Sequence, residues 1–92
     1  MRIYAGNLSL KVTEDDLRDA FLVFGKVSYV KINRGMLEDD PENFGMVGMP
    51  LHSEAKAAII GLNRKKMKGK PMVVKEAGVL SHKFPIESKI NL

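Results

Sequence analysis

Two short stretches of the chain combine an aromatic ring with small and aliphatic residues in the alternation typical of a β-strand. Residues 3–8 read IYAGNL, and residues 43–49 read NFGMVGM. If the two strands lie side by side, Tyr4 and Phe44 form a flat aromatic surface on which unpaired bases can stack. This chemistry favours single-stranded nucleic acid, and RNA in particular, as the ligand.

No group of residues in the sequence indicates catalysis or metal binding. The chain has no cysteine, which excludes disulfides and thiolate metal ligands. His52 and His82 have no acid or hydroxyl at a spacing typical of a catalytic pair, so we interpret both as surface residues. We therefore expect a protein that is not an enzyme and that needs no cofactor and no metal.

The length and the apolar pattern indicate one compact domain. A chain of 92 residues can bury a single hydrophobic core. Its start lacks the features of a secretory signal, and no apolar run is long enough to span a bilayer. We expect a soluble protein of the cytoplasm, and the lack of cysteine fits that compartment.

Positive charge is concentrated in the second half of the chain. Residues 1–50 contain 6 Lys and Arg against 8 Asp and Glu, whereas residues 51–92 contain 9 against 3. The surplus is centred on the segment 64–70, and a basic cluster beside a stacking surface would attract phosphates and make binding depend on salt. The alternative is a solvated loop whose lysines only keep the protein soluble.

The apolar periodicity alternates between that of strands and that of helices. Thr13 and Asp16 have the spacing of a helix N-terminal cap, and Ser53 is predicted to cap a second helix. This order predicts the α+β class, a ferredoxin-like βαββαβ sandwich in which two helices cover one face of a four-stranded antiparallel sheet and the other face stays open. The predicted strands are residues 2–6, 27–32, 43–49 and 72–75, and the predicted helices are residues 13–24 and 53–62.

In this order of elements the chain resembles the RNA-recognition motif family. The resemblance covers residues 2 to about 77, which gives residues 1–77 as the motif domain and residues 78–92 as a C-terminal extension. The short chain is also similar to the small single-motif RNA-binding proteins of bacteria. The residues that match are Ile3 to Leu8 in the first strand, Leu17, Phe21, Phe24, Gly25 and Val27 around the first helix, and Ala55, Ala58, Ile59, Leu62 and Asn63 in the second.

The third predicted strand matches the octamer pattern of that family only in part. Glu42 stands at the basic position, Asn43 at a glycine position, and Met46 at the position of the second stacking ring. Because one base–aromatic stack contributes about 1–3 kcal/mol, we expect weak or low-specificity binding. The octamer positions that fit are Phe44, Gly45 and Val47, and Met49 occupies the last aromatic position.

The resemblance implies a role for each residue on the open face of the sheet. Tyr4 would stack on one base, Phe44 would lie against the sugars or only pack on Tyr4, and Asn7 could hydrogen-bond a base. Lys31 and Lys75 would partly offset the repulsion from Glu42. The complete set expected to bind RNA is Tyr4, Asn7, Tyr29, Lys31, Phe44, Met46 and Lys75, with weaker phosphate contacts from Arg64, Lys65, Lys66 and Lys68. Single-stranded DNA is the alternative ligand.

A second function, protein–protein interaction or self-association, also fits the sequence. The acidic loop at residues 38–42 and the methionines weaken the case for RNA, and a homodimer or a protein partner could use the sheet, the helices or the tail. Residues 78–92 could fold back over Tyr4 and Phe44 and mask them, in which case deletion of residues 79–92 would strengthen RNA binding. The apolar residues of this tail are Val79, Leu80, Phe84, Ile86, Ile90 and Leu92.

Overall fold

The structure, a computed structural model, describes residues 1–77. The predictions about the C-terminal extension, including its packing over the sheet, therefore lie outside the described residues. In chain order the elements are β1 (Arg2–Gly6), α1 (Glu14–Leu22), β2 (Tyr29–Asn33), β3 (Phe44–Gly48), α2 (His52–Leu62), β4 (Lys66–Met67), β5 (Lys70–Pro71) and β6 (Val73–Glu76).

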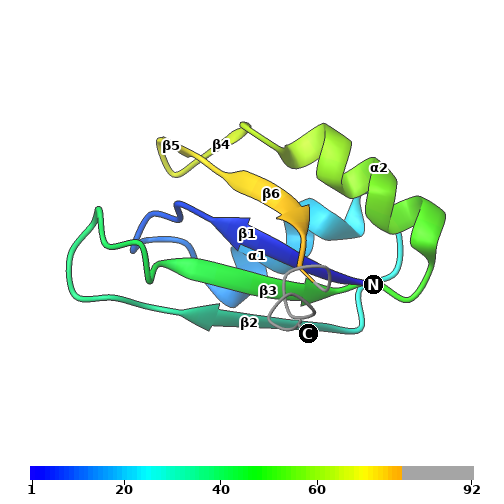
Figure 1. The fold of residues 1–92 in the computed structure, drawn as a ribbon, viewed down its shortest axis with the longest axis horizontal. Helices are drawn as coiled ribbons and strands as arrows, with labels where there is room; N and C mark the ends of the chain where they lie inside the picture. The colour runs from blue at the N-terminus through cyan, green and yellow to red at the C-terminus, as the bar shows by residue number, and fades with distance from the viewer. Residues whose placement is uncertain (78–92) are drawn as a thin grey trace, which may run out of the picture.

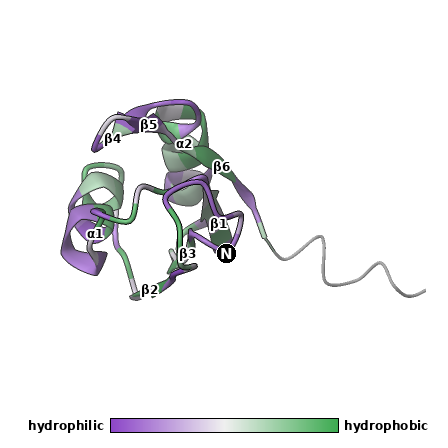
Figure 2. Ribbon diagram, turned by 90° about the vertical axis from the view of Figure 1, so that its left-hand side faces the viewer, coloured by the Kyte–Doolittle hydropathy of each residue, from purple (hydrophilic) through white to green (hydrophobic). Residues whose placement is uncertain are grey.

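Four strands form one antiparallel sheet in the order β2-β3-β1-β6, and β4 pairs with β5 in a separate two-stranded hairpin (Figure 1). Both helices lie on the same side of the four-stranded sheet, as the edge-on view in Figure 2 shows. No helix from residues 1–77 covers the opposite face. The ferredoxin-like α+β fold predicted from the sequence is confirmed.

The core lies between the sheet and the helices, and strand alternation decides which side chains enter it. In β1, Ile3 and Ala5 are fully buried whereas Tyr4 is only partly buried, because successive side chains point to opposite faces. Helix α1 contributes Leu17 and Phe21, both with no exposed surface. The other buried apolar residues are Leu8, Val12, Val30, Val47, Met49, Ala55, Ala58, Leu62, Met72 and Val74.

Helix α1 begins with the cap that the sequence predicts. The Thr13 hydroxyl accepts a hydrogen bond from the Asp16 backbone N–H at 3.0 Å, and the Asp16 carboxylate accepts one from the Thr13 backbone N–H at 3.0 Å. The second of these bonds favours the charged carboxylate, so the pKa of Asp16 is held below its usual value. Two backbone donors at the helix N-terminus are thereby satisfied.

Several local details differ from the sequence-based prediction. Helix α2 begins at His52 after Leu51, which provides no side-chain cap, so the prediction that Ser53 caps this helix is wrong. Strand β2 begins at Tyr29 rather than at residue 27. No strand was predicted in the basic segment 64–70, but most of this segment belongs to the hairpin β4–β5, which is closed by the left-handed residues Lys68 (φ 53°) and Gly69 (φ 89°).

Candidate nucleic-acid interface

Tyr4 and Phe44 lie side by side on the open face of the sheet. They come from neighbouring strands, β1 and β3, and their ring centroids are 5.5 Å apart with a 30° angle between the planes. Both rings are partly exposed. The aromatic surface predicted from the two sequence stretches is therefore present, on the face opposite the helices. We call this pair the aromatic platform.

Glycines leave room for the tyrosine rings on this face. A Cβ atom added to Gly6 would overlap the Tyr4 ring, and one added to Gly48 would overlap the Tyr29 ring. Each ring therefore lies directly over a glycine of the sheet. Since glycine has no side chain to hold the ring away from the backbone, both tyrosines lie close to the sheet, in a position to support a ligand on it.

Two lysines share the open face with the aromatic platform. The Lys75 Nζ atom lies 5.4 Å from the centre of the Tyr4 ring, over its face, which is a cation–π distance. Lys31 is exposed on β2, where it pairs with Met46 of β3. The structure thus brings Tyr4, Phe44, Met46, Lys31 and Lys75 together on one surface that offers both stacking and positive charge.

Comparison with known proteins agrees with this geometry. Residues 3–73 match the RNA recognition motif family. The chain belongs to this family. It is 36% identical over 77 residues to RbpA of Nostoc sp., covering 84% of this chain and 76% of RbpA. It is 32% identical over 76 residues to Glycine-rich RNA-binding protein 1 of Mycosarcoma maydis, covering 83% of this chain but only 43% of that longer protein.

A solved structure is similar in both sequence and fold. The crystal structure of RNA Binding Protein PG1 superposes with a TM-score of 0.74 at 32% identity, covering 85% of this chain and 94% of that chain. The predicted membership of the RNA recognition motif family is confirmed by these matches. They do not test the roles assigned to single residues, which stay predictions.

Asn7 and the basic hairpin lie at one end of the sheet, beside each other. The Asn7 side-chain nitrogen donates to the Pro71 carbonyl at 2.7 Å, which leaves its second N–H and the side-chain oxygen for a ligand. Lys70, the first residue of β5, donates through Nζ to the Glu38 carbonyl at 2.7 Å, and the same Nζ lies 3.5 Å from the Asp39 carboxylate. The four cations predicted to contact phosphate lie in the hairpin or just before it, and all four are exposed: Arg64, Lys65, Lys66 and Lys68.

Asn43, which replaces a glycine of the RNA recognition motif octamer, has a structural role that the sequence analysis missed. Its side chain is buried, with 2% of the residue exposed. The amide oxygen accepts from the Gly35 backbone N–H at 2.6 Å, and the amide nitrogen donates to the Leu37 and Glu38 carbonyls at 2.8 and 3.1 Å. Asn43 therefore ties down the loop between β2 and β3, immediately before Phe44.

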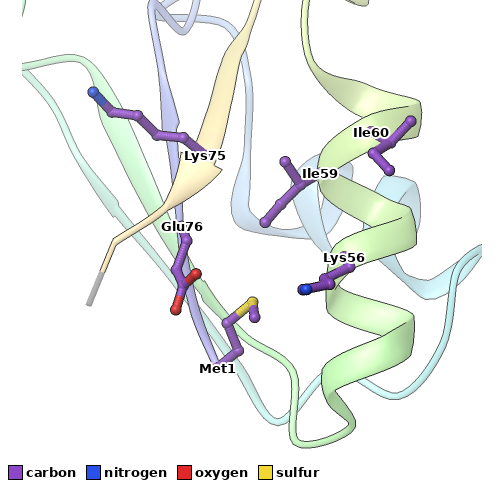
Figure 3. A pocket seen from close by; sticks show the side chains of 6 residues that line it. All are labelled: Met1, Lys56, Ile59, Ile60, Lys75 and Glu76. Atoms are coloured by element: carbon purple, nitrogen blue, oxygen red, sulfur yellow. The ribbon is translucent and has the colours of Figure 1, made fainter. Parts of the chain in front are cut away.

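A second, apolar surface lies between α2 and β6 (Figure 3). Met1, Ile59 and Ile60 line an open groove of about 330 Å³, and Ile60 is 81% exposed. The side chain of Lys75 extends away from this groove (Figure 3). The other residues lining the groove are Lys56, Lys75 and Glu76.

Among residues 1–77, no three His, Cys, Asp or Glu side chains come together in a way that could hold a metal ion. Within the same range, no helix has the length and apolar character needed to cross a membrane.

Proposed function

We propose that this protein binds single-stranded RNA, without catalysing a reaction, through the open face of its sheet. The observation that carries the proposal is the aromatic platform, in which Tyr4 and Phe44 lie 5.5 Å apart with Lys75 over Tyr4. Unpaired bases have flat faces that stack on such rings, and the bases of a duplex are not accessible in this way. The exposed lysines would attract the phosphates that link those bases.

Two departures from the family pattern on the same face support binding that is weak and broad in sequence preference. Met46 replaces a flat ring with a flexible thioether, which offers less stacking area. Glu42 places a carboxylate where the family has a cation, although Lys31 and Lys75 supply positive charge nearby. Losing one stack of about 1–3 kcal/mol lowers affinity roughly 5- to 150-fold. The names of Glycine-rich RNA-binding protein 1 and RNA Binding Protein PG1 support RNA as the ligand.

Fluorescence anisotropy with a labelled pool of random RNA hexamers tests this function. Replacing Tyr4 by Ala should lower affinity about 5- to 150-fold, whereas Tyr4→Phe should retain most of the binding because the ring remains. Arg18→Ala is the matched control, since Arg18 is on α1, on the covered side of the sheet, and pairs with Asp15. Equal binding by wild type and Tyr4→Ala would refute the proposal and direct attention to protein partners and to the apolar groove beside α2.

A further inference from the structure

The groove between α2 and β6 lies where the helix cover of the sheet ends. In β6, Val74 and Glu76 are on the helix side of the sheet, because they pair with buried residues of β1. Val74 is 2% exposed, whereas Glu76, two residues further on, is exposed and lines the groove. Helix α2 therefore covers the middle of β6 and leaves the helix side of its last residue open.

The lining of this groove is mainly apolar and continues the hydrophobic core to the surface. On α2, Lys56, Ile59 and Ile60 have the i, i+3, i+4 spacing of one helix face. Met1 lies on the strand side of the gap (Figure 3). Met1 and Ile59 pack against the core, whereas Ile60 is 81% exposed. The exposed isoleucine next to these two side chains makes a contiguous apolar surface, which is typical of a contact site.

The charges at this groove do not favour nucleic acid as its occupant. Lys56 and Glu76 have opposite charges, and the side chain of Lys75 extends away from the groove (Figure 3). The groove is also on the side of the sheet opposite the aromatic platform, since Glu76 pairs with the buried Ile3 whereas Lys75 pairs with Tyr4. An apolar polypeptide segment fits this surface better than a phosphate chain does.

The described part of the chain leads directly to this groove. The Ala77 backbone N–H donates to the Arg2 carbonyl at 2.9 Å, so the pairing with β1 continues beyond Glu76 and brings Ala77 close to Met1. Residue 78 is a glycine, which accepts the backbone conformations of a sharp turn. The chain can therefore change direction at the mouth of the groove.

The next residues have the side chains that the groove requires. Val79 and Leu80 follow the glycine, and Leu80 is three residues after Ala77, or about 10 Å of extended chain. A segment tethered so closely has an effective concentration in the millimolar range, which gives it an advantage over an unlinked partner. The tether favours the C-terminal extension of the same chain as the occupant.

We propose that Val79 and Leu80 dock in the groove between α2 and β6 of their own chain. Their side chains cover Ile60 and lie against Met1, so the C-terminal extension begins on the helix side of the sheet. The aromatic platform stays open, in contrast to an extension that folds back over it. This inference does not depend on RNA binding and is tested without RNA.

The experiment records nuclear Overhauser effects (NOEs) between methyl groups of the ¹³C,¹⁵N-labelled full chain. We expect NOEs from the Val79 and Leu80 methyls to those of Ile60 and Met1. Ile60→Ser should remove the contacts to Met1 as well and move the Leu80 amide resonance to its position in a synthetic peptide of residues 78–92. Val23→Ser is the matched control, because Val23 is 80% exposed at the end of α1, away from the groove, and it should leave the Leu80 resonance unchanged.

Three results would overturn the proposal. NOEs from Leu80 to Tyr4 or Phe44 would place the extension over the aromatic platform. NOEs seen only between labelled and unlabelled chains of a mixed sample would make the occupant a second copy. The absence of any NOE between Leu80 and α2 would refute docking altogether. Leu80→Ser gives the reciprocal check, since it should shift the amide resonance of Ile60 and leave that of Phe44 unchanged; an unshifted Ile60 amide would contradict the proposal.

Discussion

Replacing Asn43 by Gly, the residue typical of the family at this position, should destabilise this protein. The change removes three hydrogen bonds of a side chain that is 2% exposed, and these bonds hold the loop between β2 and β3. Each is worth about 0.5–1.5 kcal/mol net, and the added backbone freedom of glycine costs about 0.5–1 kcal/mol. Water can satisfy some of the freed loop groups, so we expect a loss of about 2–4 kcal/mol in the free energy of unfolding.

Urea denaturation followed by far-UV circular dichroism measures this loss directly. In thermal denaturation the same change should lower Tm by roughly 8–30 °C, since 1 kcal/mol corresponds to about 4–8 °C in a domain of this size. Asn33→Ala is the control, because Asn33 is exposed and makes one side-chain hydrogen bond, to the Glu42 carbonyl at 2.8 Å; it should cost less than about 1 kcal/mol. A loss below about 0.5 kcal/mol for Asn43→Gly would show that these bonds do not stabilise the loop.

Three further predictions concern charge, packing and pH. Glu42→Lys should raise affinity for RNA hexamers and steepen the salt slope by about 0.7, measured by anisotropy; an unchanged slope would place RNA away from this end of β3. Leu17→Ala removes a fully buried side chain under Gly45, so it should lower the free energy of unfolding, measured by urea denaturation, by about 2–5 kcal/mol. A loss of less than about 1 kcal/mol would contradict this packing. The pKa of Asp16 is lowered on folding, so its stabilisation is present above its usual pKa of 3.8 and is lost as pH falls through the lower folded value. Asp16→Asn should therefore be less stable than wild type at pH 7 and approach it towards pH 2, and a difference independent of pH would refute this.

The sequence was sufficient for the features that depend on local periodicity. The alternation of Ile3 and Ala5 with Tyr4 predicts which side of β1 is buried, and the structure confirms it. The spacing of Thr13 and Asp16 predicts the start of α1, since a capping box involves only residues that are three apart. These signals lie within a few residues of each other, so the tertiary structure is not needed to interpret them.

Features that depend on contacts across the fold could not be predicted in the same way. The Tyr29 ring lies over Gly48, and Gly48 pairs with Arg2. Both features depend on the register of three strands, which no single stretch of the sequence specifies. The anchoring role of Asn43 depends on the path of the loop at residues 35–43, which brings the Gly35 backbone N–H to the Asn43 side chain. An asparagine in a loop has many possible hydrogen-bond partners, so the sequence does not specify which of them it uses.

The most direct test of the central claim is an NMR titration of the ¹⁵N-labelled full chain with unlabelled random RNA hexamers at low salt. We predict amide shift changes concentrated on β1, β2 and β3, around Tyr4, Phe44 and Met46, that are lost in Tyr4→Ala. The absence of shifts at millimolar RNA, or shifts confined to α2 and the groove beside Ile60, would contradict RNA binding on the open face of the sheet.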